Sequence, residues 1–139
     1  MFTGRIEHVG TVAAIEGDLL RITTDVAVAP GGSVCLDGIR FTVEPGSRGE
    51  LRVVVTEETR RRTTLDRIAG GMRMHIELPV AVGDRIDGHL IQGHVEGVGK
   101  VLRVDAEPAG RRIWIKPPER LLARLVAKTA AVEDRPHPW

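Results

Sequence analysis

A histidine and an arginine are the residues of this sequence best suited to act on a small molecule. His89 lies in DGHLIQGHVEGVG (87–99), and an imidazole, with an ordinary pKa of ~6.5, can transfer a proton near neutral pH. Arg40, in DGIRFTV (37–43), offers a charged fork of donors to ligand carbonyls or to a phosphate. Each residue also has a structural interpretation, a histidine hydrogen-bonded at a turn and a strand arginine whose stem covers apolar surface. The sequence alone leaves both open.

The other chemically active side chains fit structural roles better. The run RRR at 60–62 is more typical of a solvated charged loop than of an anion site. Cys35 is most simply a small buried hydrophobe, and His75 and His94 are expected to be structural or exposed. Aromatic residues make up only 3% of the chain, so a flat ligand would be held mainly by backbone groups, threonine hydroxyls and aliphatic side chains.

Composition narrows the classes of partner. The 139 residues are 42% apolar and 28% charged, with a net charge of +1. Nucleic acid is disfavoured as a partner, because binding phosphates requires clustered surplus Lys and Arg. No run approaches the ~18 apolar residues of a membrane span. No signal peptide is visible and the single cysteine allows no internal disulfide, so we expect a cytoplasmic protein.

Short runs of alternating polarity indicate β-structure. In MRMHIEL (72–78), one side would carry Met72, Met74, Ile76 and Leu78 and the other Arg73, His75 and Glu77, a period of two that is typical of strands. Turn residues such as APGG and EPGSRG separate the runs. The similar runs are RIEHVGTVAAI, LLRITT, SVCLDGIRFTV and ELRVVVT. With no room for crossover helices, about six strands predict an antiparallel barrel or sandwich.

Two stretches depart from the strand pattern. EETRRRTTLDRI (57–68) is polar and is expected to hold a short helical turn. PPERLLARLVAK (117–128) has leucines at helical spacing, with Pro and Glu at its start and Lys at its end. These signals predict an amphipathic helix over 118–128.

The chain begins the same segment twice. FTGRIEHVGTV (2–12) aligns without gaps with IQGHVEGVGKV (91–101), with matches of Gly4 to Gly93, Glu7 to Glu96, Val9 to Val98, Gly10 to Gly99 and Val12 to Val101. Residues 1–86 are therefore predicted to form one barrel, and 87–139 a shortened second copy of two strands and a helix.

Half a barrel should need a host surface, because two strands and a helix rarely hold a core alone and their edges invite association. Residues 87–139 should therefore dock on the first barrel, pair with another chain or be partly disordered, and we favour docking across a dimer interface. The sequence thus predicts a homo-oligomer, a dimer or a trimer.

Three segments resemble riboflavin synthase. They are MFTG at the N-terminus, ETRRRTTL (58–65) and above all DGHLIQGHVEGVG (87–99). The resemblance covers about residues 1 to 132 and implies a six-stranded antiparallel Greek-key barrel followed by a partial second one. It further implies a lumazine or riboflavin ligand bound between barrels of neighbouring subunits. The family transfers a four-carbon unit between two molecules of 6,7-dimethyl-8-ribityllumazine, which gives riboflavin and a pyrimidinedione, and requires no metal or redox cofactor.

Transferring the family's functional positions gives a set of candidate residues. The resemblance implies catalytic roles for His89 and Phe2. The ligand-binding candidates that it implies are Thr3, Gly4, Ser33, Arg40, Thr42, Glu58, Thr59, Thr63 and Gly88.

The sequence departs from the family at several of these places. Arg40 stands where the family commonly has Cys, and Arg cannot act as a nucleophile because it stays protonated. Cys35 is expected to face the opposite side from Arg40, since side chains alternate along a strand. Phe41 replaces Leu, and the family's last segment of the second barrel has no counterpart in TAAVEDRPHPW.

Three functions remain open at this stage. The leading hypothesis is a protein that binds a lumazine, riboflavin or a related heterocycle in the N-terminal barrel at a subunit interface. The first alternative is an active enzyme, either a riboflavin synthase assembled across subunits or a relative that acts on another polycyclic molecule. The second is a non-catalytic partner of a full-length synthase. Fold alone does not decide among them.

Overall fold

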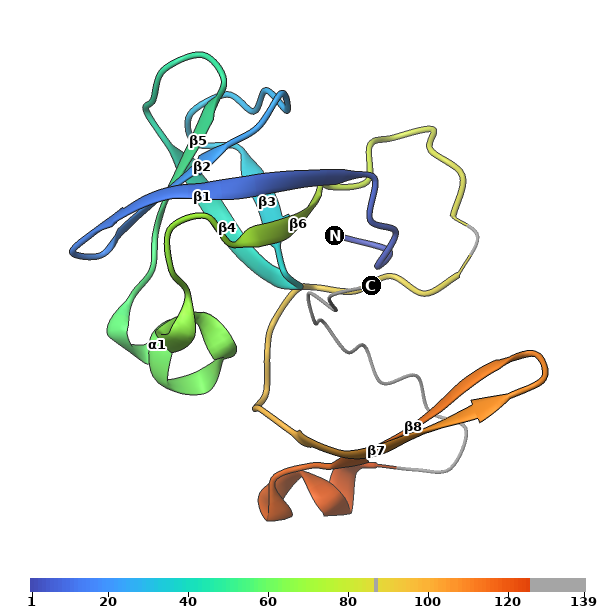
Figure 1. The fold of residues 1–139 in the computed structure, drawn as a ribbon. Coiled ribbons are helices and arrows are strands. Elements are labelled where there is room, and N and C mark those ends of the chain that lie inside the picture. The colour runs from blue at the N-terminus through green and yellow to red at the C-terminus, as the bar shows by residue number, and fades with distance from the viewer. Residues whose placement is uncertain (87, 126–139) are drawn as a thin grey trace.

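Six antiparallel strands close into a barrel in the order β1-β2-β5-β4-β3-β6 (Figure 1). The computed structural model describes residues 1–86 and 88–125. The barrel strands are β1 (His8–Glu16), β2 (Leu19–Thr23), β3 (Ser33–Leu36), β4 (Ile39–Glu44), β5 (Glu50–Val54) and β6 (Arg73–Glu77). The predicted barrel is confirmed.

Alternating side chains fill the barrel interior. Along β4, Ile39, Phe41 and Val43 are buried, whereas Arg40 and Thr42 are exposed. Burying an aliphatic or aromatic side chain stabilises a fold by about 1.5–3 kcal/mol, so this alternation fixes which face of each strand turns inward. The fully buried members of the interior include Leu20, Ile22, Val34, Leu36, Leu51, Val53, Met74 and Ile76.

A two-residue turn joins β3 to β4. Asp37 and Gly38 both adopt positive φ, 45° and 75°, which is the conformation of a type I′ hairpin turn and the reason Asp-Gly is favoured there. The turn is tied to β6, because the Asp37 Oδ1 accepts the His75 backbone N–H at 2.7 Å and the Asp37 N–H donates to the His75 carbonyl at 3.0 Å. Three strands are thus held in register around this corner.

Two short helices follow β5, which confirms the helical turn predicted within 57–68. In α1 (Glu57–Arg62) the Thr56 side chain caps the N-terminus by accepting the Thr59 N–H. A 3₁₀ helix, η1 (Thr64–Arg67), follows and carries one buried residue, Leu65. The Arg60 side chain donates to the Gly17 carbonyl at 2.7 Å, so α1 lies beside the turn between β1 and β2.

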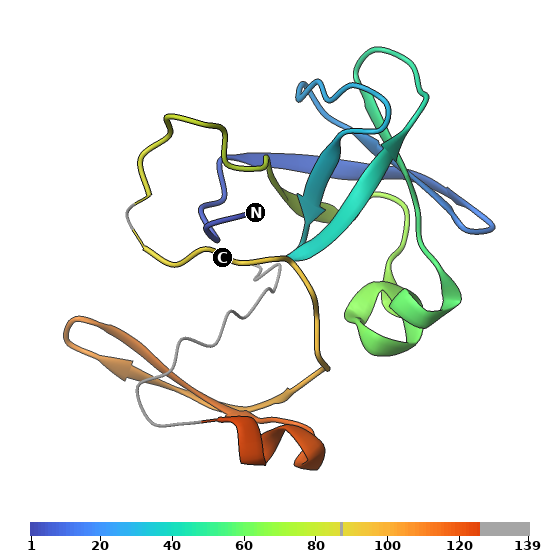
Figure 2. The same cartoon turned by 180° about the vertical axis from the view of Figure 1, so that it is seen from behind.

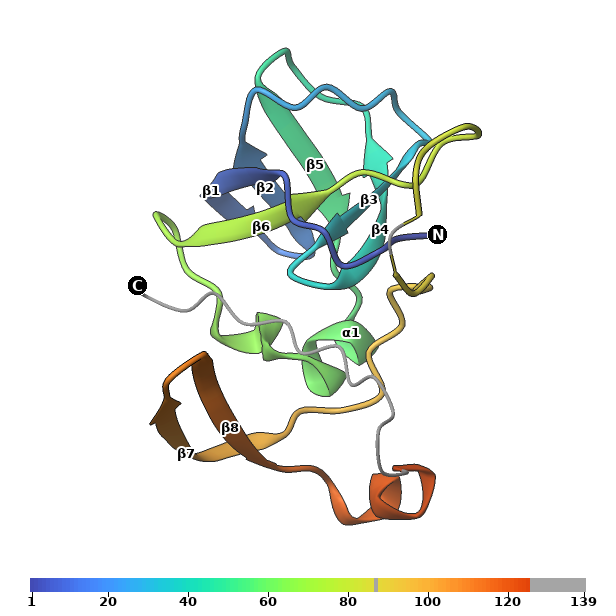
Figure 3. The same cartoon turned by 90° about the vertical axis from the view of Figure 1, so that its right-hand side faces the viewer.

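The second unit is a separate hairpin. β7 (Lys100–Glu107) pairs with β8 (Gly110–Lys116) in a two-stranded sheet of its own. After β6 the chain makes a wide loop and returns beside the N-terminal arm before it reaches β7 (Figure 2). The β7–β8 hairpin and α1 lie beyond the same end of the barrel (Figure 3). The two strands predicted for the shortened copy are present, while the boundary between 1–86 and 87–139 stays a prediction.

The helix predicted over 118–128 differs in type from the one observed. Within the described residues it is a 3₁₀ helix, η2 (Glu119–Arg124), and positions 126–128 lie outside them. The physical reason is missing packing, since Leu122 and Leu125 remain 53% and 49% exposed and most α-helices depend on a buried apolar face. No helix in the described parts of the chain is long and apolar enough to cross a membrane.

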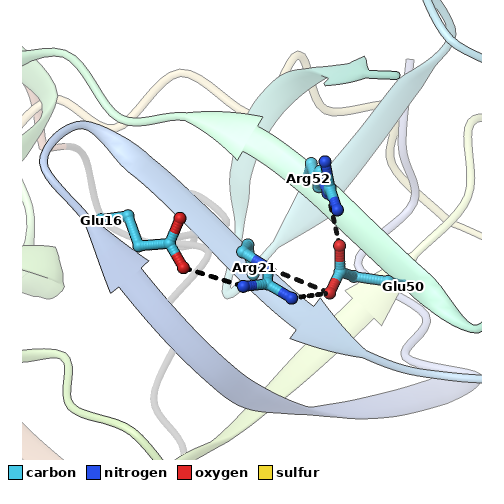
Figure 4. A network of polar contacts seen from close by, with 4 residues as sticks. All are labelled: Glu16, Arg21, Glu50 and Arg52. Carbon is cyan, nitrogen blue, oxygen red and sulfur yellow. Dashed lines mark hydrogen bonds and ion pairs between the residues drawn. The ribbon is translucent and has the colours of Figure 1, made fainter. Parts of the chain in front are cut away.

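An ionic network crosses the outer face of β1, β2 and β5 (Figure 4). Arg21 and Arg52 are directly opposite each other on β2 and β5, a pairing that is unfavourable by itself. Glu50 resolves it by accepting from the Arg21 Nε and Nη2 at 3.0 and 2.8 Å and from the Arg52 Nε. Glu16 accepts from the Arg21 Nη1 at 2.8 Å. The hydrogen bonds from Arg21 and Arg52 hold the pKa of Glu50 below its usual range.

Candidate ligand-binding site

The outer face of the β3–β4 hairpin gathers three of the predicted ligand-binding residues. Ser33 is directly opposite Thr42 on the neighbouring strand, and Cys35 is opposite Arg40. The Arg40 Nη2 donates to the Ser33 Oγ at 3.1 Å. Ser33, Arg40 and Thr42 therefore form one polar group on the outside of the barrel, which we call the hairpin face.

The expectation that Cys35 faces away from Arg40 is wrong. Directly opposed residues of an antiparallel pair point to the same side of the sheet, so both belong to the hairpin face. The sequence argument counted alternation straight through 35–40, whereas the turn at Asp37 and Gly38 reverses the chain between the two residues. Cys35 is nonetheless buried, as expected.

A buried carboxylate fastens the N-terminal arm (residues 1–4) next to this face. Glu77 lies opposite Cys35 on β6 and is only 6% exposed. Its Oε1 accepts the Thr3 N–H at 2.6 Å, the Thr3 hydroxyl at 3.2 Å and the Gly4 N–H at 3.1 Å. A buried carboxylate needs such donors, so Glu77 and the arm depend on each other. Two predicted site residues, Thr3 and Gly4, are thereby placed one strand away from Cys35.

The alternation of the sequence placed Glu77 on the face opposite Met74 and Ile76 but gave no signal that it binds the arm. Its side chain does point away from the interior, as predicted for 72–78, and the arm then covers it. Only a contact between residues 74 positions apart in the sequence makes this carboxylate structural, and no local pattern encodes such a contact.

The start of the second copy returns to the first barrel here. Phe2 exchanges backbone hydrogen bonds with Ile91, at 2.8 and 2.7 Å, and the Arg40 N–H donates to the Gly93 carbonyl at 3.0 Å. Gly93 has a φ of +75°, and a Cβ there would lie 3.1 Å from the Arg40 Cβ and 3.2 Å from the Arg40 nitrogen. Only glycine fits such a close approach of two backbones without strain.

The first half of β4 does not pair with β5, so the edge of β4 that faces away from β3 is open to this returning segment. β4 pairs with β5 at Val43 and Glu44 only, within the described barrel. On the outer face the next position of β5, Val54, is 44% exposed, and continuing the register sets it beside Thr42. Along this edge of β4, the hairpin face is therefore bordered by the exposed aliphatic side chain of Val54 near Thr42 and by Gly93 near Arg40.

The predicted residues on and after α1 already have intramolecular roles. The Thr59 hydroxyl lies 2.9 Å from the Thr56 hydroxyl, and the Thr63 hydroxyl donates to the Thr59 carbonyl at 2.7 Å while it accepts the Leu65 N–H at 3.2 Å. Glu58 forms an ion pair with Arg62 at 3.0 Å. Glu58, Arg61 and Arg62 line a shallow pocket of about 270 Å³. A ligand role for Glu58, Thr59 and Thr63 stays a prediction.

The catalytic candidates differ in their exposure. Phe2 is 2% exposed, so its ring is part of the packing between the arm and the barrel. His89 and Gly88 are both exposed in the long connection between β6 and β7, and their roles stay predictions. His94 is exposed and His75 lies in β6 beside Asp37, as expected. Burial raises the pKa of the Asp37 carboxyl, against the lowering effect of the His75 N–H.

No group of three or more His, Cys, Asp or Glu that could hold a metal ion occurs among the described residues.

A family model places the barrel among known proteins. The model of the lumazine-binding domain matches residues 3–79, which is more than half of the chain and includes every barrel strand. The chain belongs to the lumazine-binding domain family. The matched residues include Thr3 and Gly4 of the N-terminal arm, the hairpin face and Glu77.

This lumazine-binding domain protein is also similar to riboflavin synthases, which confirms the resemblance. It is 32% identical to the riboflavin synthase of Brucella abortus, over 96% of this chain and 72% of that protein. The similarity to the enzyme of Actinobacillus pleuropneumoniae is 29% over 96% of this chain. The chain spans 66% of the length of the latter enzyme, so it is shorter than these relatives.

Solved structures show the same fold. LumP complexed with riboflavin superposes with a TM-score of 0.73 at 19% identity, covering 91% of this chain and 72% of that one. LumP complexed with 6,7-dimethyl-8-(1'-D-ribityl) lumazine gives a TM-score of 0.69 at 21% identity, covering 91% and 71%. At these identities the likeness concerns the fold of the lumazine-binding domain and its second unit.

Proposed function

We propose that this protein binds a lumazine, riboflavin or a related flat heterocycle on the hairpin face. The observation that carries the proposal is that Ser33, Arg40 and Thr42, each assigned to ligand binding from the sequence, converge on one face of a lumazine-binding domain. That three residues from two strands meet there is a property of the fold, since Ser33 and Thr42 are nine positions apart and become neighbours only through the hairpin.

The hairpin face has the chemistry that a flat nitrogen heterocycle requires. Hydroxyls of Ser33 and Thr42 both donate and accept, and so suit ring carbonyls and ring nitrogens. Arg40 adds a charged donor. The exposed side chain of Val54 supplies apolar surface for a ring. A few directed polar groups around apolar surface are typical of small-molecule sites.

The arm and the returning segment complete the proposed site. Thr3, Gly4 and the backbone of Gly93 border the hairpin face through Glu77 and Arg40. Neither segment would stay there without its own anchor, because both are irregular backbone. The proposed site therefore depends on long-range contacts as well as on the barrel.

We further propose that a second copy of the chain closes the site. The β7–β8 hairpin keeps apolar side chains accessible, among them Val104, Ile113 and Ile115 at 44%, 40% and 38% exposure. Such a face favours association. Light scattering coupled to size-exclusion chromatography should give the mass of a dimer or a trimer, and a monomer at micromolar concentration would contradict this part of the proposal.

Binding is tested by titration with riboflavin and 6,7-dimethyl-8-ribityllumazine, followed by their fluorescence. We expect saturable quenching, and weaker binding by about 0.5–1.5 kcal/mol in Thr42→Ala, the net contribution of one hydrogen bond. Thr23→Ala is the matched control, because Thr23 is also an exposed strand threonine but lies on β2. If Thr42→Ala binds the ligand as tightly as Thr23→Ala does, Thr42 is not part of the site. If neither ligand is quenched, the proposed function is contradicted.

Catalysis is a second candidate function, favoured by the similarity to riboflavin synthases over 96% of the chain. Release of riboflavin from 6,7-dimethyl-8-ribityllumazine under steady-state conditions would establish it. If His89 transfers a proton, His89→Gln should lower kcat by about 10²-fold or more, whereas the exposed His94→Gln should not. Saturable binding without turnover would leave binding as the function.

A further inference from the structure

Within the residues that the structure describes, Arg40 has no carboxylate partner, unlike most of the arginines. Arg5, Arg21, Arg52, Arg60, Arg61, Arg62, Arg67, Arg103, Arg112 and Arg124 each contact a carboxylate oxygen within 4.0 Å. Arg40 instead donates to a neutral hydroxyl, the Ser33 Oγ. Among the described residues, the charge of Arg40 is therefore not compensated by an ion pair.

The carboxylate in the same row of the sheet as Arg40, that of Glu77, already accepts hydrogen bonds from the N-terminal arm. Arg40, Cys35 and Glu77 are successive neighbours across β4, β3 and β6. Glu77 directs its oxygens at the backbone of Thr3 and Gly4. It is thus used by the N-terminal arm, and it forms no ion pair with Arg40 within 4.0 Å.

Arg40 is also held in place at both ends. Its backbone N–H is bonded to the Gly93 carbonyl, and its guanidinium is bonded to Ser33. One bond to Ser33 leaves further N–H groups of the five-donor fork available. A positioned guanidinium with spare donors matches the geometry of phosphate and carboxylate groups, which it can bind through two parallel hydrogen bonds.

We propose that Arg40 makes the hairpin face selective for an anionic heterocycle, one that carries a phosphate or a carboxylate, over its neutral counterpart. This inference rests on the proposed function and adds the charge of the ligand to it. An anion gains a charged hydrogen bond at Arg40 that a neutral carbonyl cannot match, and it supplies the counter-charge that the fold leaves out.

The test compares ligands that differ by one anionic group. Riboflavin and riboflavin 5′-phosphate form one pair, with the charge on the side chain, and lumazine and its 6-carboxylate form another, with the charge on the ring. In the unaltered protein the anionic member of at least one pair should bind about tenfold more tightly or better. The pair that shows this preference tells which part of the ligand meets Arg40.

Variants assign the preference to this one side chain. Arg40→Gln, which keeps a donor to Ser33 but removes the charge, should abolish the preference, whereas Arg40→Lys should retain part of it. Arg48→Gln is the matched control, because Arg48 is an exposed arginine in the loop between β4 and β5 and its loss should leave the preference unchanged. Circular dichroism establishes that each variant is folded.

Equal affinity for both members of both pairs would overturn the inference and leave the proposed function standing. A preference that survives in Arg40→Gln would also overturn it. Binding of none of the four compounds would contradict the proposed function, and this inference with it.

Discussion

The two units of this chain begin with similar sequences and reach different degrees of burial. In the barrel, Val12 of β1 is 1% exposed and Ile76 of β6 is 0% exposed. In the second unit every residue of β8 is exposed. A barrel interior exists only when the last strand pairs with the first, as β6 does with β1. The repeated segment is therefore sufficient to form a strand, whereas a buried core forms only where the whole sheet closes.

The matched glycines Gly10 and Gly99 allow close packing in both units. A Cβ at Gly10 would overlap Ile22 of the next strand and come within 2.9 Å of Ile76, and a Cβ at Gly99 would lie 2.8 Å from Ile115. Each glycine lets an isoleucine of a neighbouring strand cross close to the backbone. Packing thus explains the two matched glycines. Gly10 lies in the closed barrel, and Gly99 lies beside the separate two-stranded sheet.

The largest contrast is expected from shortening an isoleucine in each unit. Ile76→Ala leaves a cavity in the closed interior and should lower the free energy of unfolding by about 2–5 kcal/mol. In a single copy of the chain, Ile115→Ala removes a side chain that is 38% exposed and should change the free energy of unfolding far less, so the comparison is made at a protein concentration too low for the proposed association. Urea unfolding of both variants measures this difference. Equal losses would mean that the second unit is buried as well, as in an oligomer.

The two glycines give the next contrast. Gly10→Ala should destabilise the protein by about 1–3 kcal/mol, because the methyl group has to displace side chains packed within the barrel. Gly99→Ala should have a smaller effect, since Ile115 can move toward solvent. Thermal unfolding compares the two. A larger loss at Gly99 would show that the second unit has a packed interior of its own.

The next effect is confined to the place where the arm meets the barrel. Glu77→Gln keeps the shape of the side chain but loses the charge that the Thr3 and Gly4 N–H groups contact. Since hydrogen bonds to charged groups contribute about 1.5–3 kcal/mol, the arm should open more often, with faster amide exchange at Thr3 and Gly4 than at Val53. Unchanged exchange at these two amides would contradict the anchoring role of Glu77.

The smallest effect is expected on the outer surface of the barrel. Because the pKa of Glu50 is lowered in the folded state, the stabilisation from its ionised form is complete above its ordinary pKa of ~4.3. It is lost as the pH falls through the lower pKa of the folded protein. Glu50→Gln should therefore be less stable than the unaltered protein at pH 7 and approach it in stability below pH ~4. A stability difference that is independent of pH would contradict this account.

Local pattern was sufficient to predict the barrel and insufficient for its surroundings. Alternation in 72–78 placed Met74 and Ile76 on one face of the strand, and both are buried, whereas Met72 and Leu78 at the ends of the run are 41% and 38% exposed. Burial on one face of a strand leaves a period of two. The same rule failed between Cys35 and Arg40, where a turn intervenes. Leucine spacing after Pro118 predicted a helix but not its 3₁₀ form, because helix type depends on packing that the sequence pattern does not contain.

The candidate site was predicted in part for the same reason. The resemblance supplied Ser33, Arg40 and Thr42, and the hairpin register brings them together. Glu77 was missed because its role arises from a contact with the distant arm. The isolated charge of Arg40 could not be foreseen either, since it depends on which carboxylates the fold brings near and which it directs elsewhere.

The fastening of the arm by Glu77 has a practical consequence for anyone who produces this protein. Met1 is 63% exposed while its carbonyl accepts the Val80 N–H at 2.9 Å, so the first residue is pinned with its side chain in solvent. An affinity tag fused ahead of Met1 would emerge within a few residues of Thr3 and would crowd the neighbouring hairpin face. Ligand titrations are therefore best performed after such a tag has been removed by a protease.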